Sequence, residues 1–129
     1  MKLLDGALGI HGQALSVRTK RLELLAQNLA NADTPNFKAR DIDFRQVLAE
    51  ANNQTTAMTA TRDAHYELGE TGNPDGILFR VPFNTAVDGN TVESSIEQAQ
   101  YGKAAAQYQT TLNFLESRIS GVRKALRGE

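Results

Sequence analysis

The stretch that decides the fold runs from residue 25 to residue 38 and reads Leu25-Ala26-Gln27-Asn28-Leu29-Ala30-Asn31-Ala32-Asp33-Thr34-Pro35-Asn36-Phe37-Lys38. Helical periodicity leads into this stretch, and Pro35 then disfavours the α conformation at Thr34 and removes a backbone donor. The sequence therefore predicts a long helix that ends at a turn. We expect the side chains of Asn28 and Asn31 to satisfy backbone groups left free at the helix end.

Upstream of the turn, apolar residues repeat with the spacing of a helix that packs against another helix. One row has leucine at four consecutive heptads, and a second row includes Leu25 but is interrupted by His11 and Arg18. Such a repeat is typical of coiled-coil-like packing. We therefore expect a helix and turn over residues 1–33, with subunit packing carried by Leu8, Leu15, Leu22, Leu25 and Leu29.

Residues 92–129 predict a second long helix. Its apolar stripe alternates spacings of four and three residues, which is again a coiled-coil-like pattern. Asn90 or Thr91 is the predicted N-cap, and the basic residues near the C-terminus suit the negative end of the helix dipole as a solvated helix end. The residues of this stripe that we expect to pack against other subunits are Tyr101, Tyr108, Leu112, Leu115, Ile119, Val122 and Leu126.

Residues 34–91 have a different character, because polar runs and turn signals replace the heptads. The apolar residues from Ile42 to Leu48 fit either a short helix or an extended strip. Residues 77–83 are strand-like, and Pro82 restricts that strand to a sheet edge. The fold class expected is all-α, with one domain over residues 1–129. The two long helices form a coiled-coil-like pair, joined by a long, partly extended or mobile middle segment with a short β-hairpin.

Composition excludes several classes of protein. The chain has 129 residues, 40% of them hydrophobic and 6% aromatic, and its net charge of −1 gives no basic field for nucleic acid. The absence of cysteine excludes disulfides and thiolate chemistry. No apolar run approaches the roughly 18 residues of a membrane span. Asp5 interrupts the apolar start of the chain, so we expect no cleaved secretory signal.

The residues that could carry catalysis do not form a convincing site. His11 and His65 lie far apart in the sequence, and no histidine pair has the spacing of a metalloprotease site. The carboxylates of Asp41, Asp43 and Glu50 are expected to be salt-bridged or solvated rather than catalytic. The sequence around Asp88 lacks the further ligands of a calcium loop. We therefore expect no enzyme activity, no metal, no cofactor and no small-molecule substrate.

The two stripes together offer more apolar surface than one pair of helices can cover. Each fully buried leucine or isoleucine stabilises a fold by roughly 1.5–3 kcal/mol relative to an exposed one. Several such residues left exposed favour association. We therefore expect the isolated chain to be a loosely ordered monomer at low concentration that docks or polymerises at high concentration.

The sequence from Asn28 to Lys38 resembles a signature of flagellar rod and hook proteins, Asn-x-Ala-Asn-x-x-Thr-Pro-Gly-(Tyr or Phe)-(Lys or Arg). Its matching residues are Asn28, Ala30, Asn31, Thr34, Pro35, Phe37 and Lys38. The continuation through Phe44, the short chain and the Asp88–Glu93 sequence before the second helix resemble the proximal-rod members of this family. Asn36 departs from the usual glycine, but asparagine tolerates the left-handed conformation better than most residues.

This resemblance implies a structural subunit of the proximal flagellar rod, which assembles helically into the drive shaft that transmits torque across the periplasm. It implies a location in the basal body near the inner membrane and export by the flagellar type III apparatus. The implied partners are copies of the chain, other rod proteins, FliE and proteins of the inner-membrane ring and export gate. The alternative is a soluble helical adaptor or export chaperone that binds a partner helix. A DNA-associated protein is disfavoured by the net charge.

Overall fold

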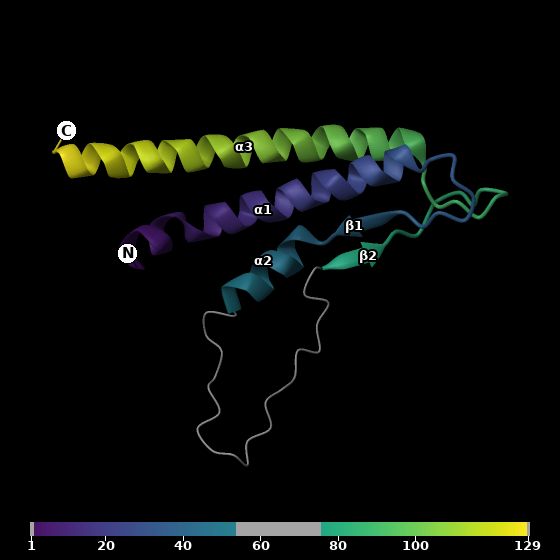
Figure 1. Cartoon of the computed structure of the whole chain (residues 1–129), viewed down its shortest axis with the longest axis horizontal. Coiled ribbons are helices and arrows are strands. Elements are labelled where there is room, and N and C mark those ends of the chain that lie inside the picture. The colour runs from purple at the N-terminus through teal and green to yellow at the C-terminus, as the bar shows by residue number, and fades with distance from the viewer. Residues whose placement is uncertain (1, 54–75, 129) are drawn as a thin grey trace, which may run out of the picture.

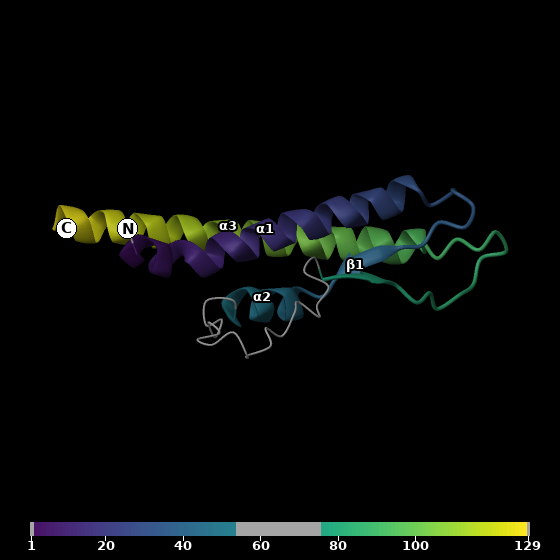
Figure 2. The same cartoon turned by 60° about the horizontal axis from the view of Figure 1, so that its bottom comes forward.

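The computed structural model describes residues 2–53 and 76–128. Two long helices, α1 (Lys2–Ala30) and α3 (Ser94–Arg127), run antiparallel and side by side (Figure 1). Strand β1 (Arg40–Ile42) and the short helix α2 (Phe44–Asn53) lie beside α1, and strand β2 (Ile77–Phe79) lies beside β1. Figure 2 shows the same pairing of α1 with α3 after the molecule is turned. The expected all-α class with paired terminal helices is confirmed.

The buried residues of the two long helices include small and polar side chains, and the four leucines of the predicted row are not among them. The buried residues of α3 are Glu97, Ala104 and Thr111, which are spaced by seven. On α1, Ala14 and Asn28 are buried, and each precedes a leucine of the predicted row by one residue. One residue is about 100° around a helix. The predicted leucine row therefore lies at the flank of the contact between the helices, where Leu15, Leu22 and Leu29 are half-buried.

The start of α3 differs from the prediction. Glu93, not Asn90 or Thr91, is the N-cap, with an extended backbone and no side-chain hydrogen bond to the helix. The Asn90 side chain is bound instead to the turn after α1, and the Thr91 hydroxyl accepts a hydrogen bond from the Ala39 N–H just before β1. The Glu93 carboxylate accepts hydrogen bonds from the backbone N–H groups of Phe83 and Asn84, each at 3.2 Å. It thereby holds the segment between β2 and α3.

The strand predicted within residues 77–83 is present, but it is short and does not form a hairpin. β2 pairs antiparallel with β1 in the register Asp41 opposite Leu78. The two strands are far apart in the sequence, so a local turn does not join them. Sequence analysis missed β1 because three residues are too few to show an alternating pattern. Gly76 precedes β2 with a φ of +59°, and a Cβ there would collide with Val47 of α2.

The apolar residues after Ile42 form the helix α2 rather than an extended strip. The Asp43 carboxylate accepts hydrogen bonds from the N–H groups of Arg45 at 3.0 Å and Gln46 at 3.3 Å, which is the geometry of an N-cap. The ring of Phe44 lies 4.1 Å from the guanidinium carbon of Arg18, so a cation–π contact ties α2 to α1. Predictions that concern residues 54–75, including His65, lie outside the described residues.

Candidate subunit-packing site

The signature turn is closed by the residues that its pattern singled out. Asn31 donates from its side chain to the Gln27 carbonyl at 2.8 Å, and accepts from the Thr34 hydroxyl at 3.1 Å. The same Gln27 carbonyl also accepts from the Asn31 backbone N–H at 3.1 Å, so the Asn31 side chain adds a second hydrogen bond at the end of α1. Asn36 has a φ of +60°, so asparagine does adopt the left-handed conformation at the position where glycine is commoner in the signature.

Asn28 has a different role from the predicted one. Its fully buried side chain reaches to β1, where the amide nitrogen donates to the Arg40 carbonyl at 2.7 Å and the amide oxygen accepts from the Arg40 N–H at 3.0 Å. The same amide nitrogen lies 3.2 Å from the Glu97 carboxylate on α3. Asn28 therefore joins α1, β1 and α3, and it pairs with Arg40 as a neighbouring strand would.

The side chain of Asn90, in the segment before α3, holds the signature turn. Its amide nitrogen lies within hydrogen-bond distance of three backbone carbonyls, those of Asn31 at 3.0 Å and of Ala32 and Thr34 at 2.8 Å. Its amide oxygen accepts from the Val92 N–H at 2.7 Å. The side chain is only 3% exposed. Sequence analysis missed this role, since an asparagine in a loop gives no periodic signal that links it to residues 31–34.

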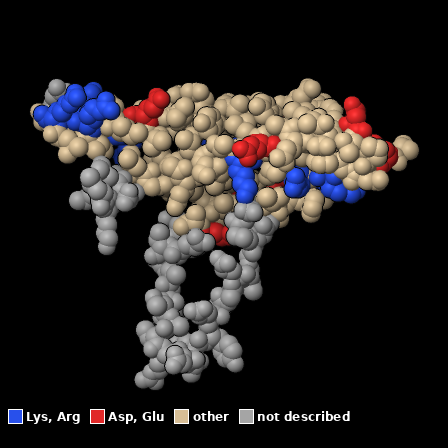
Figure 3. Space-filling model, in the orientation of Figure 1, with Lys and Arg blue, Asp and Glu red and all other residues tan. Residues whose placement is uncertain are grey.

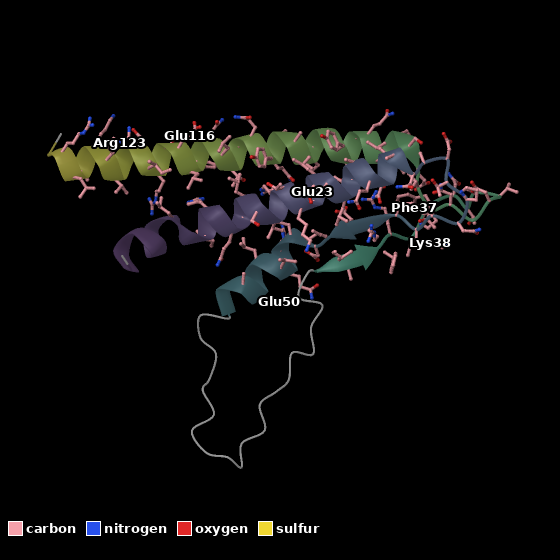
Figure 4. All side chains as sticks on the ribbon, in the orientation of Figure 1. Glu23, Phe37, Lys38, Glu50, Glu116 and Arg123 are labelled. Carbon is pink, nitrogen blue, oxygen red and sulfur yellow. The ribbon has the colours of Figure 1, made fainter. Side chains whose placement is uncertain are left out.

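Backbone contacts extend this arrangement into a clasp, which we define as residues 36–39 together with residues 88–91. The Asn36 N–H donates to the Asp88 carbonyl and the Thr91 N–H to the Phe37 carbonyl, both at 3.0 Å. The ammonium group of Lys38 adds a hydrogen bond of 3.0 Å to the Gly89 carbonyl. A Cβ at Gly89 would lie 2.6 Å from the Asn36 side chain. Figure 4 shows Phe37 and Lys38 at this end of the molecule.

A partly buried ionic cluster, in which Glu97 is fully buried, fixes the sheet against both long helices. Arg21 of α1 makes a two-point contact with Asp41 of β1, at 2.9 and 3.2 Å. Arg80 binds the other side of Asp41 at 2.6 Å and also pairs with Glu97 of α3. Arg21 further reaches Gln100 of α3 at 3.2 Å. Paired buried charges of this kind specify one arrangement of the elements, because each ion is costly without its partner.

The ionic cluster lowers the pKa of Asp41. Burial alone raises the pKa of a carboxyl group, but hydrogen bonds from Arg21, from the Ile42 N–H and from Arg80, together with the charge of Arg21, hold the pKa of Asp41 below its usual value. The three carboxylates that the sequence grouped do not converge. Asp43 caps α2, and Glu50 accepts a hydrogen bond from Gln46 at 3.0 Å. The expectation of a salt-bridged or solvated set is therefore met.

The residues predicted for subunit packing occupy three environments. Leu25 is completely buried, so its side chain is used within the chain. Tyr101 and Ile119 are each 39% exposed and Leu126 is 80% exposed. The other predicted residues are half-buried at the flanks of the helix pair, namely Leu8, Leu15, Leu22, Leu29, Tyr108, Leu112, Leu115 and Val122. Beyond Thr111, no side chain of α3 that the structure describes is buried.

The basic residues at the end of α3 are exposed, as the sequence predicted. Figure 3 shows lysine and arginine side chains gathered at the end of the molecule where α3 ends, and Lys124 and Arg127 lie in the last turn of that helix. Within residues 2–53 and 76–128, acidic and histidine side chains form no group arranged to hold a metal ion. None of the described helices combines the length and apolarity needed to cross a membrane.

Comparison with known proteins points to the same family as the signature. Residues 8–38 match the family model described as "Flagella basal body rod protein". The chain is 46% identical to the flagellar basal body rod protein FlgB of Aeromonas hydrophila over 97% of this chain and 96% of that protein. It is 44% identical to FlgB of Cereibacter sphaeroides (95% and 94% covered) and 38% identical to FlgB of Salmonella typhimurium (97% and 96%).

The chain belongs to the FlgB family of flagellar basal body rod proteins. It is accordingly a structural protein of the rod in the basal body. The region matched by the family model includes the whole leucine row and the whole signature turn. The FlgB relatives align over nearly the whole chain, so the similarity also reaches the loop that holds the turn and the helix α3.

Proposed function

We propose that this chain is a subunit of the proximal rod that works mechanically. It packs its two long helices beside copies of itself and other rod proteins, and the resulting tube transmits torque as a drive shaft. Membership of the FlgB family supports the rod assignment. The exposed apolar side chains described below support the proposal that packing between chains is the function of the helices. The whole chain, residues 1–129, acts as a single rod-subunit domain.

The main support comes from what we call the free end, residues 2–13 of α1 and 112–128 of α3, where none of the described side chains is buried. Phe114 is 62% exposed and Leu126 is 80% exposed on α3, and Ile10 is 47% exposed on α1. Full burial of one such side chain is worth roughly 1.5–3 kcal/mol. A neighbouring helix that covers several of them therefore gains enough free energy to hold subunits together.

A shallow apolar groove in the free end fits this role. It has a volume of about 320 Å³ and is lined by four apolar residues, Leu8 of α1 and Ile119, Val122 and Leu126 of α3, together with Arg123 and Arg127. Three of these four residues lie on the stripe of the second helix, and Leu8 begins the leucine row. The two predicted stripes thus meet at one concave surface, which suits the apolar side chains of another subunit's helix.

The opposite end supports a role in force transmission. We call residues 21–42 and 77–104 the turn end, which contains the clasp, the sheet and the ionic cluster. Its buried hydrogen bonds and ion pairs join α1, β1, β2 and α3 in one arrangement. A subunit that keeps a fixed angle between its helices and its sheet passes torque to its neighbours with little loss through bending.

The proposal also includes the finer points that the family resemblance implies. The subunit lies at the base of the rod, close to the inner membrane, and contacts FliE and proteins of the membrane ring and export gate. The flagellar type III apparatus exports it without a cleaved signal peptide. No enzymatic activity is part of the proposal. Capture of FliE by site-specific cross-linking in basal bodies tests the position, and loss of rod incorporation in a type III export mutant tests the route.

Assembly is tested by replacing Leu126 with aspartate in cells that lack the native chain. The variant should be exported and melt like the native monomer, because Leu126 is exposed, yet rods should be absent and swimming lost. Leu126→Met is the matched control, since it keeps an apolar side chain and should swim normally. Normal motility of Leu126→Asp, with intact rods in electron micrographs, would contradict a packing role for the stripe.

A further inference from the structure

The two outer edges of the small sheet differ. The outer edge of β1 is occupied, because the Asn28 side chain takes both the N–H and the carbonyl of Arg40. On β2, the Arg80 N–H donates to the Ala39 carbonyl at 2.8 Å. Backbone groups alternate in direction along a strand, so those of Phe79 and Val81 point away from β1. Within the described residues, these groups have no backbone partner.

The open edge carries exposed apolar side chains. Phe79 is 72% exposed and Val81 is 86% exposed, and Phe83 follows at 87%. Proteins usually protect an edge strand with charge, a bulge or a covering element, because exposed strands recruit other strands. Here Pro82 limits the length of the edge, but the apolar side chains at Phe79 and Val81 remain uncovered. A strand added at this edge would use both the open backbone groups and the exposed apolar side chains.

A basic groove lies along the small sheet, and Leu78 and Phe79 of β2 form part of its wall. It has a volume of about 710 Å³, and its other walls come from β1, α1, α3 and the start of α2. The charged groups lining it are four arginines (Arg18, Arg21, Arg45 and Arg80) and two aspartates (Asp41 and Asp43), which leaves a net charge of +2. The charge of the groove is thus opposite in sign to that of the chain as a whole.

Two of the four arginines have no carboxylate partner among the described residues. Arg18 donates to the Gln107 side chain at 3.1 Å and lies over the Phe44 ring, but its buried Nε has no hydrogen-bond partner. The Arg45 side chain is exposed and makes none of the salt bridges seen in the described residues. A buried donor without a partner destabilises the fold, and a carboxylate that entered the groove would supply the missing partner.

We propose that the edge of β2 and the basic groove bind an extended segment of another protein in which apolar and acidic residues alternate. The segment adds a third strand at Phe79 and Val81, and its carboxylates enter the groove beside Arg18 and Arg45. We take this segment to come from a different subunit of the rod, and that part of the inference rests on the proposed function. The recognition itself follows from the open edge and the charge of the groove.

Repulsion between like charges opposes the pairing of two copies of this chain through β2. Two copies that paired β2 with β2 would bring the arginines of both grooves together, and like charges that face each other are destabilising. A heterologous strand that carries carboxylates has no such cost. The observations therefore favour a different chain over a second copy, and self-pairing through β2 becomes an outcome that the experiment can detect.

The test uses the purified full-length chain and two labelled peptides, one of alternating valine and glutamate and one of alternating valine and lysine. Fluorescence anisotropy should show binding of the glutamate peptide that weakens with salt, and much weaker binding of the lysine peptide. Hydrogen exchange should show new protection of the Phe79 and Val81 amides. Arg18→Gln should weaken binding by about tenfold, which is the loss of one charged hydrogen bond.

Two further variants keep the test decisive. Arg45→Gln changes an exposed side chain, so it should fold normally and still weaken binding in the same direction. Arg123→Gln, at the far end of α3, is the matched control and should change affinity less than twofold. Equal binding of both peptides, unchanged exchange at Phe79 and Val81, or dimers that form through β2 would overturn the proposal. Such a failure would leave the Leu126→Asp motility test unaffected, so the two proposals fail separately.

Discussion

The turn end and the free end of this molecule differ in what they bury. At the turn end, the fully buried positions include Leu25 together with the polar residues Asn28 and Glu97, and Asn90 is only 3% exposed. At the free end, large apolar side chains such as Phe114 and Leu126 face outward. Polar networks fix one geometry within the chain, whereas apolar surface is non-directional and suits contact with several neighbours. The subunit therefore determines its own shape at one end and depends on other chains at the other.

The largest expected effect on the folding of the isolated chain comes from removing Glu97. Glu97→Ala removes one of the two carboxylates bound to Arg80 and one hydrogen bond of the Asn28 side chain from a buried site, so the free energy of unfolding should fall by about 3 kcal/mol. Chemical denaturation followed by circular dichroism measures this change. Glu116→Ala, an exposed glutamate on the same helix (Figure 4), is the control and should change stability by less than about 0.5 kcal/mol. Equal losses of stability in the two variants would contradict the claim that buried polar side chains stabilise the turn end.

The second prediction concerns the residue that closes the signature turn. Asn90→Ala leaves the carbonyls of Asn31, Ala32 and Thr34 without their shared donor, and stability should fall by about 2–3 kcal/mol. Exchange of the amides in residues 31–39 should accelerate at the same time. Asn113→Ala, which removes an exposed asparagine from α3, should alter neither quantity. An Asn90→Ala chain as stable as the native one would show that the clasp is not needed to hold the turn.

The third prediction is a pH dependence at the turn end. The pKa of Asp41 is lower in the folded chain than in the unfolded one, so its ionised form stabilises the fold at pH values above the unfolded pKa of about 3.9. That contribution is lost as the pH falls further and the folded carboxyl group is protonated. Denaturation between about pH 5 and pH 2.5 should therefore show a steeper loss in the native chain than in Asp41→Asn. Parallel pH profiles would contradict the assigned ion pairs.

The smallest expected effect on folding is at the free end. Phe114→Asp should change the free energy of unfolding of the isolated monomer by less than about 0.5 kcal/mol, because the ring is already 62% exposed. The same variant should abolish rod assembly, whereas Phe114→Leu should retain it. Sedimentation, thermal melting and motility together measure these outcomes. A loss of monomer stability comparable with that of Asn90→Ala would mean that the free end is part of the core.

Sequence patterns predicted what depends on local spacing. The heptads of Leu15 and Leu22 indicated α1, Pro35 indicated its end, and the tolerance of asparagine for left-handed backbone agreed with the conformation of Asn36. Each of these signals depends on residues that are close together in the chain, so it can be recognised in a single sequence. The pairing of α1 with α3 followed because each helix carried an apolar stripe in need of cover.

What the sequence did not reveal depends on contacts between distant positions. Asn28 meets Arg40 and Glu97, and Asn90 meets the signature turn, across separations of 12 to 69 residues. Single asparagines show no periodicity, so neither role could be read from spacing. The helix contact was also rotated from the leucine row, because close packing favours small residues such as Ala14 and Ala104 between two helices that also share hydrogen bonds.

Native-state hydrogen exchange of the purified monomer tests the contrast between the two ends most directly, because it reports local stability along the chain. The account predicts strong protection at the turn end, above all in residues 24–31 and 97–111. It also predicts protection that declines steadily through residues 112–128 of α3 and through the first turns of α1. Uniformly strong protection along the whole of α3 in the isolated monomer would contradict it.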